Sequence, residues 1–166
     1  MLVKRASAVV VALLTVILYA TSSVAQTTTT VNFTAQIIIQ DECNILTTAT
    51  LDFGTEGVLD ANVDATADFT VQCTSNTAYR MRLDNGSTTG GTTTTRLMTD
   101  GVNTVQYQMF RDSARTLNWG DNDGFDTNDD TGTGAVQTHT IYGRVPAQTT
   151  PPAATYTDTV TITVAY

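Results

Sequence analysis

The densest group of side chains that could bind an ion lies in an aspartate-rich segment at residues 120–134. Its acidic members are Asp121, Asp123, Asp126, Asp129 and Asp130. Calcium prefers carboxylate oxygens, and Asp121, Asp123 and Asp126 are the candidate ligands. The spacing does not match an EF-hand loop, because Gly124 and Phe125 stand where that loop needs a neutral spacer and an oxygen ligand. We interpret the segment as a solvated surface loop, with a weak calcium site as the alternative.

The rest of the chain contains no recognisable catalytic motif. His139 is the only histidine, and no Gly-x-Ser-x-Gly or comparable nucleophile motif accompanies it. Gly90-Gly91 resembles a phosphate loop, but neither a helix pattern nor a lysine follows it. We therefore predict that the protein is not an enzyme, that it needs no cofactor, and that His139 lies on the surface of a strand.

The only two cysteines are Cys43 and Cys73. In an oxidising compartment two cysteines most simply pair, and a disulfide closing this loop would stabilise the fold by about 3–4 kcal/mol. A metal site is the alternative. It is disfavoured because the chain has one histidine and no Cys-x-x-Cys motif.

The N-terminus carries the signals of export. Lys4 and Arg5 precede an apolar run at residues 8–20, and Ser23-Val24-Ala25 offers the small residues of a cleavage site. We predict that residues 1–25 are a signal peptide and that the mature chain is soluble and exported. An uncleaved anchor helix is the alternative, but the run is shorter than the roughly 20 residues that span a bilayer.

Charge argues against two classes of partner. Removing Lys4 and Arg5 leaves six of the eight basic residues against sixteen acidic residues, so the mature net charge is 6 − 16 = −10. Nucleic acids and anionic membranes need a cationic protein face. We therefore expect the mature protein to bind neither.

Alternating apolar residues predict strands throughout the mature chain, and no segment shows a helical period. Residues 27–43 and 156–166 give the cleanest strand patterns, and residues 50–53, 65–73, 79–83 and 136–145 give further ones. Residues 96–99 and 102–110 flank Asp100-Gly101, which predicts a hairpin. About 140 residues with seven or eight short antiparallel strands fit one immunoglobulin-like β-sandwich. The two cleanest strands lie at opposite ends of the mature chain, which suggests that another subunit's strand is added to the fold.

A set of landmarks spread over the mature chain resembles the spore coat protein U domain family, which includes pilin subunits of archaic chaperone–usher pili. The landmarks are Cys43, Leu51-Asp52-Phe53-Gly54, Phe69-Thr70-Val71-Gln72-Cys73, YQMFRDSAR at 107–115, Trp119-Gly120-Asp121, IYGRVP at 141–146 and YTDTVTITV at 156–164. Each piece alone is weak evidence, but together they are specific and occur in the family's order.

The resemblance implies an incomplete β-sandwich that is completed by a donor strand. A periplasmic chaperone would lend a strand first, and at an outer-membrane usher the N-terminal extension of a neighbouring pilin subunit would replace it. Residues 26–36 would be that extension and 37–166 the pilin domain, although the alternation continues to Ile39. The donor face would comprise Val31, Phe33, Ala35, Ile37 and Ile39, and the acceptor edge Tyr156, Val160, Ile162, Val164 and Tyr166.

The leading hypothesis is therefore a structural subunit of a surface pilus or coat, which passes through the periplasm and supports adhesion and biofilm formation. The alternative is a secreted binding or coat module whose N-terminal strand completes its own sheet, with calcium at the acidic loop.

Overall fold

The computed structural model describes residues 25–166, so the predicted signal peptide lies outside the described residues except for Ala25. The described residues form eight strands and no helix. The strands are β1 (Cys43–Thr48), β2 (Val63–Cys73), β3 (Ala78–Leu83), β4 (Arg96–Thr99), β5 (Thr104–Phe110), β6 (Asn128–Thr131), β7 (Val136–Val145) and β8 (Ile162–Ala165). With no helix among them, these residues offer no helical membrane span.

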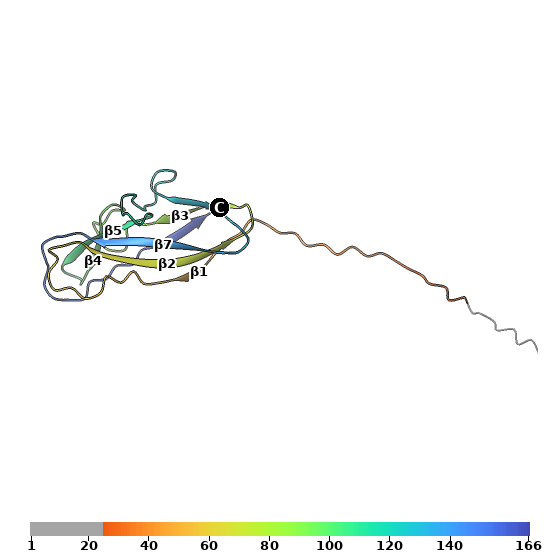
Figure 1. The fold of residues 1–166 in the computed structure, drawn as a ribbon, viewed down its shortest axis with the longest axis horizontal. Helices are drawn as coiled ribbons and strands as arrows, with labels where there is room; N and C mark the ends of the chain where they lie inside the picture. Colours follow the sequence, from red (N-terminus) through yellow and green to blue (C-terminus); the bar gives the residue numbers. More distant parts are fainter. Residues whose placement is uncertain (1–24) are drawn as a thin grey trace, which may run out of the picture. The chain divides into compact units, whose positions relative to one another are not determined.

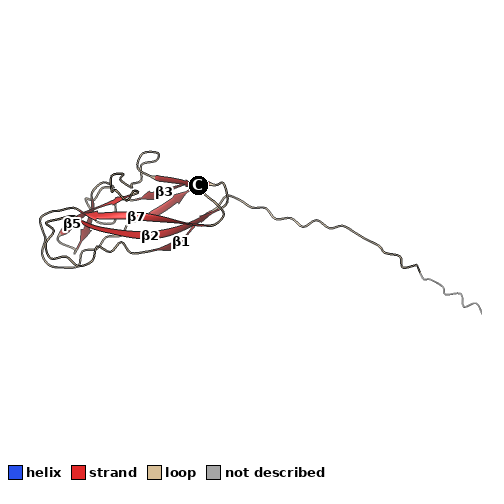
Figure 2. Ribbon diagram, viewed as in Figure 1, coloured by secondary structure: helices blue, strands red, loops and turns tan. Residues whose placement is uncertain are grey.

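The strands form two antiparallel sheets, which confirms the predicted all-β sandwich (Figure 2). One sheet has five strands in the order β1-β2-β7-β5-β4, and the other has three in the order β6-β3-β8. Figure 1 shows β2 beside both β1 and β7, as their pairing requires. Residues 38–166 make one compact unit, and the described residues 25–37 lie outside it.

The core lies between the sheets, because alternate residues of β2, β3 and β5 point inward. On β3, for example, Tyr79, Met81 and Leu83 are buried while Arg80 and Arg82 are partly exposed. Trp119 fills the centre of the core, and its indole nitrogen donates a hydrogen bond to the Met81 carbonyl at 3.0 Å. The alternation in the sequence thus identified the inner faces of these strands.

The predicted disulfide is present. Cys43 in β1 and Cys73 in β2 are direct partners in the antiparallel ladder, and their sulfurs are bonded at 2.03 Å. The bond ties the edge strand β1 to the interior strand β2. The predicted hairpin is also confirmed, with β4 and β5 paired around Gly101, whose φ is +99°.

Three predicted strands differ from the structure. Residues 50–53 form no strand, and the pattern at 156–166 yields only β8, because the Asp158 side chain bonds to a loop before β8 begins. Residues 25–42 also have no assigned strand. A strand requires hydrogen bonds to a neighbouring chain segment, which alternation by itself does not supply.

Candidate functional site

The most unusual feature of the sandwich is the outer edge of β8. One side of β8 pairs with β3, and no other strand of residues 25–166 pairs with its second side. The amide of Asp84 donates to the Thr161 carbonyl, so the backbone groups of Thr161 face the β3 side. Because successive residues alternate in an antiparallel strand, the N–H and C=O groups of Ile162 and Val164 point to the open side. This edge can therefore accept another strand.

The side chains beside this edge leave the core incompletely covered. Val160, Ile162 and Val164 pack against the core but are only partly buried, as is Tyr156. These are four of the five residues predicted for the acceptor edge. Tyr166, the fifth, is 61% exposed.

A second row of apolar side chains comes from the other sheet. β1 is the edge of the five-stranded sheet and lies near β8. Its Ile45 and Leu46 are 40% and 47% exposed, and the ladder has an irregularity between Ile45 and Thr47. Leu51 and Phe53 continue this row and are partly buried against the core. Partly exposed apolar residues thus border the sandwich on both sheets, where an additional apolar strand would bury them.

The start of the predicted acceptor segment is held by a carboxylate that the sequence analysis did not single out. Asp158 Oδ1 accepts hydrogen bonds from the amide and hydroxyl groups of both Ser87 and Thr88, at 2.9–3.1 Å. Its Oδ2 accepts the Tyr107 hydroxyl at 2.7 Å. Burial opposes ionisation of Asp158, but the hydrogen bonds from Tyr107, Ser87, Thr159 and Thr88 outweigh it and lower the pKa of the carboxyl. Asp158 therefore remains a charged acceptor.

Two sequence signals could have identified Asp158. It is the one acidic residue in an otherwise neutral run of threonine and apolar residues at 156–166. The second signal is Gly86 in the turn after β3, where φ is +83° and any side chain would collide with the Asp158 carboxylate. The turn needs glycine both for its backbone conformation and for this close approach.

The predicted donor residues lie on an exposed, uncharged segment. Val31, Phe33 and Ile37 are 81–90% exposed, and Ala35 is exposed as well. Residues 26–40 contain no charged residue. Large apolar side chains rarely stand exposed in a row on a soluble monomer, so this segment has the character of an interaction surface.

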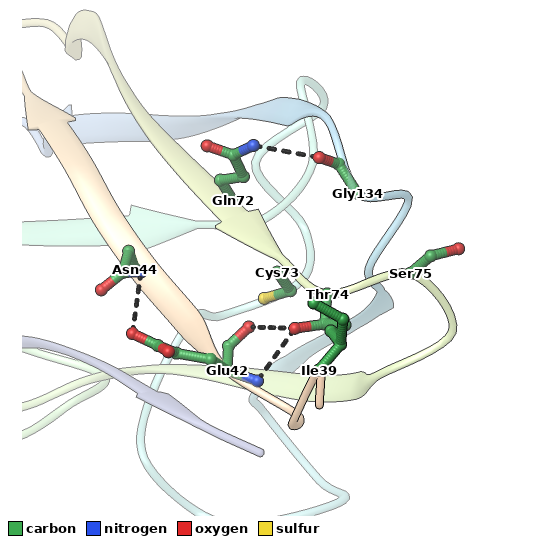
Figure 3. Close-up of a pocket in the computed structure, with 8 residues that line it drawn as sticks. All are labelled: Ile39, Glu42, Asn44, Gln72, Cys73, Thr74, Ser75 and Gly134. Carbon is green, nitrogen blue, oxygen red and sulfur yellow. Dashed lines mark hydrogen bonds between the residues drawn. The ribbon is translucent and has the colours of Figure 1, made fainter. Parts of the chain in front are cut away.

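The N-terminal segment is hydrogen-bonded to the domain from Gln40 onward. The Thr74 hydroxyl donates a hydrogen bond to the Gln40 carbonyl at 3.0 Å. The Glu42 amide donates to Thr74 Oγ1, and the Thr74 amide donates to the Glu42 carbonyl. Figure 3 shows the Glu42–Thr74 hydrogen bonds of this anchor at a shallow pocket of about 350 Å³, which Ile39 also lines. The donor pattern thus continues to the residue directly before the anchor.

The acidic segment is held to the protein by ion pairs. Arg82 makes a bidentate pair with Asp123, and Arg80 makes one with Asp129 at 2.9 Å. The guanidinium groups lower the pKa of both carboxyls. Arginine at these β3 positions thus satisfies carboxylates that would otherwise repel one another.

Asp126 differs from the predicted solvated loop because it is buried. It accepts hydrogen bonds from the Asn118 side chain at 3.2 Å and from the Asn122 amide at 2.8 Å. Asp129 and Asp130 lie in β6 rather than in a loop, and Asp121 is exposed. Within residues 25–166 no three acidic, histidine or cysteine side chains are grouped to hold a metal ion.

The prediction for His139 is wrong. Its side chain is only 10% exposed and lies between Phe69 and Tyr79, with ring centroids 5.5 and 6.0 Å away. Nε2 of His139 is 2.9 Å from the Tyr79 hydroxyl, and the pair joins β7 to β3 across the core. Burial lowers the pKa of His139, although Asp130 partly opposes this shift. An imidazole can fill a core position when a hydroxyl satisfies its nitrogen, which the strand pattern did not reveal.

Comparison with known proteins decides the family. A model described as the Spore Coat Protein U domain matches residues 28–163. The chain belongs to this family. No curated protein matches the chain. Among solved structures, it is similar to a chain in the CsuC–CsuE chaperone–tip adhesion subunit pre-assembly complex from archaic chaperone–usher Csu pili of Acinetobacter baumannii, with a TM-score of 0.55 and 26% identity. The match covers 77% of this chain and 40% of that chain.

Packing explains two of the landmarks that identify the spore coat protein U domain here. Gly143, in the IYGRVP motif, faces Leu51 and Phe53 of the Leu-Asp-Phe-Gly motif. A methyl group at Gly143 would lie 2.7 Å from Leu51 and 2.9 Å from Phe53. Phe53 also packs edge-on against Tyr107, with ring centroids 6.1 Å apart. The two motifs therefore form one packing unit that covers the five-stranded sheet.

Proposed function

We propose that the protein is a structural subunit of a surface pilus or coat that is assembled by donor-strand exchange. The exposed apolar segment at residues 26–39 of one copy adds to the open edge of β8 in another copy. The observation that carries this proposal is the combination, in one chain, of an unpaired sheet edge over a partly exposed core and an exposed, uncharged, alternating apolar segment. The apolar segment would supply a strand for the unpaired edge, and the edge would supply backbone partners and an apolar surface for the segment.

The energetics support such an exchange. Val31, Phe33, Ile37 and Ile39 are at least 69% exposed. Burying four side chains of this size would contribute about 6–12 kcal/mol before ordering costs. This is similar to the whole stability of a typical domain, about 5–15 kcal/mol. Completion by a donor strand therefore couples folding to assembly.

The route to the surface follows from the same proposal. Residues 1–25 direct export as a signal peptide, and a periplasmic chaperone covers the β8 edge until an outer-membrane usher brings the next subunit. The domain comprises residues 37–166, preceded by the donor extension at 26–36; the anchor at Gln40 favours a donor that reaches Ile39. The assembled polymer supports adhesion and biofilm formation. The family match and the similar chain from a chaperone–subunit complex support this route.

Paired charge substitutions in the donor segment test the proposal. Phe33→Asp places a charge on the proposed inward face, and Thr34→Asp places the same charge one residue later on the opposite face. Exported mature protein would be run on a denaturing gel with and without boiling. We expect the wild type and Thr34→Asp to give a ladder that collapses to one band on boiling, and Phe33→Asp to give monomer.

Deletion of residues 26–36 should also abolish the ladder. Unchanged ladders from both the deletion and Phe33→Asp would contradict strand exchange. A wild-type monomer under both gel conditions would instead indicate a secreted module that completes its own sheet.

A further inference from the structure

The C-terminal segment presents a physical problem before a donor arrives. Val160, Ile162 and Val164 are only partly buried along an edge that has no strand on its outer side within the described chain. Apolar residues in this state gain free energy if the strand shifts to cover the core. A strand that shifted in this way would close the edge and obstruct the donor. The segment must therefore be held in place by contacts outside the apolar row.

The contacts that hold it are polar and lie immediately before β8. Thr157 exchanges two backbone hydrogen bonds with Thr99 of β4, at 2.9 and 3.0 Å. The Thr161 amide donates to the Asp84 side chain at 2.9 Å. Between them, Asp158 joins the loop after β3 to Tyr107 of β5. The segment is thus fixed to both sheets at residues 157–161, and its open edge begins at Ile162.

Asp158 is the centre of this arrangement because both of its oxygens are used. Oδ1 receives the Ser87 and Thr88 donors, and Oδ2 receives the Tyr107 hydroxyl, which is itself in a buried residue. If the segment moved over the core, the carboxylate and the Tyr107 hydroxyl would lose these partners together. Leaving a partly buried charge and a buried hydroxyl unpaired is unfavourable, so the movement is opposed.

We propose that Asp158 is a positioning residue for strand exchange, which holds the acceptor edge open and in register until the donor strand binds. This inference rests on the proposed function, since it assigns a role within that same exchange. A preorganised edge reduces the ordering required during capture, so the effect of Asp158 falls mainly on the rate of association. Once the donor is bound, its own backbone pairing holds the edge, and Asp158 matters less for dissociation.

The test measures how fast the full chain captures a donor peptide. A fluorescent peptide with the sequence of residues 27–40 would be added in excess to dilute full-length protein, and binding would be followed by anisotropy. Asp158→Ala removes the positioning carboxylate. Asp112→Ala is the matched control, because Asp112 also accepts several hydrogen bonds, from the Thr116 and Leu117 amides and the Thr116 hydroxyl, within a turn of its own.

We expect Asp158→Ala to slow association by about tenfold relative to Asp112→Ala, which corresponds to about 1.4 kcal/mol. The dissociation rate should change much less. Tyr107→Phe removes only the bond to Oδ2 and should slow association by a smaller factor, which keeps the test available if Asp158→Ala does not fold. Combining the two substitutions should slow association no more than Asp158→Ala alone, because Tyr107 acts through Asp158.

Each outcome has a distinct meaning. If the wild type captures the peptide but Asp158→Ala and Tyr107→Phe associate as fast as Asp112→Ala, the positioning role is wrong and the proposed function stands. If Asp158→Ala leaves the association rate unchanged and only speeds dissociation, Asp158 stabilises the bound complex, and the positioning role is also wrong. If the wild type does not capture this peptide, or captures its Phe33→Asp version equally well, the proposed function fails, and the role of Asp158 fails with it.

Discussion

At the scale of single residues, the interior depends on polar groups whose partners are distant in sequence. Arg96 is fully buried, and its guanidinium donates to the carbonyls of Leu83, Asp84, Thr93 and Trp119. Burial lowers the pKa of Arg96, although nearby Tyr107 and Asp84 oppose this shift. The four hydrogen bonds that Arg96 donates compensate for the removal of the cation from water. Arg96 thereby connects the start of the β4–β5 hairpin to the end of β3.

His139 makes stability depend on pH. Its pKa is lowered in the folded protein from the ordinary value of 6.5, so at acidic pH the unfolded chain binds more protons than the folded one. The contribution is fully present above about pH 6.5 and is lost as the pH falls through the lowered pKa. We expect urea unfolding to show decreasing stability on acidification, with a smaller decrease in His139→Gln than in the wild type.

The comparison with His139→Gln is needed because several carboxyls also have lowered pKa values, among them Asp64 and Asp158. Their contributions are likewise lost on acidification, at lower pH, and are shared by both proteins. Identical pH profiles for the two proteins would show that His139 does not contribute.

At the scale of elements, close approach between two segments depends on glycine, which has no Cβ. The side chains of Leu51 and Phe53 pack against β7 at Gly143, where they occupy the space that a Cβ would fill. This contact explains why residues 50–53 bury apolar side chains without joining a sheet. The segment packs over the five-stranded sheet, and the residues that it contacts there come from distant parts of the chain.

Substitution of Gly143 tests this packing. Gly143→Ala should reduce the free energy of unfolding by about 1–3 kcal/mol, because an added methyl group overpacks the contact with Leu51 and Phe53. Gly57→Ala is the matched control, since a methyl group there would meet no atom within 4 Å and the position has no positive φ. Chemical denaturation of both variants measures the difference. Equal stability of the two variants would contradict the close packing.

At the scale of the whole molecule, the two strands that border the proposed acceptor site are held by different kinds of contact. The Cys43–Cys73 bond closes a separation of 30 residues and holds β1 against β2. β1 also borders the partly exposed core, so the disulfide fixes one side of the proposed acceptor site. The other side, β8, is fixed by the hydrogen bonds of residues 157–161.

Removal of the disulfide should destabilise the protein strongly. Replacing both cysteines by alanine should lower the free energy of unfolding by about 3–4 kcal/mol in the chain-entropy model. Thermal unfolding of the wild type with and without a reducing agent, beside the double variant, measures this loss. The reducing agent should have no effect on the double variant. A wild type that melts at the same temperature after complete reduction would contradict the prediction.

The sequence alone determined much of this fold. Alternation identified β2 and β3 with their inner faces and β7 as a strand, Asp100-Gly101 located the hairpin, and the two cysteines specified the disulfide. These features are local, or depend on a single possible pairing, so they can be read without knowing the rest of the molecule. The family resemblance came from the order of short motifs along the chain.

Only the tertiary structure decided which edge stays open and what holds it. The sequence shows that residues 156–166 alternate, but it does not show that Asp158 bonds to Ser87, Thr88 and Tyr107 and leaves only Ile162–Ala165 as β8. It likewise gave no sign that His139 lies in the core or that Asp129 and Asp130 belong to β6. The physical reason is the same in each case: alternation reports which face of a segment is apolar, whereas hydrogen-bond partners are brought together from distant parts of the chain by the packing of two sheets.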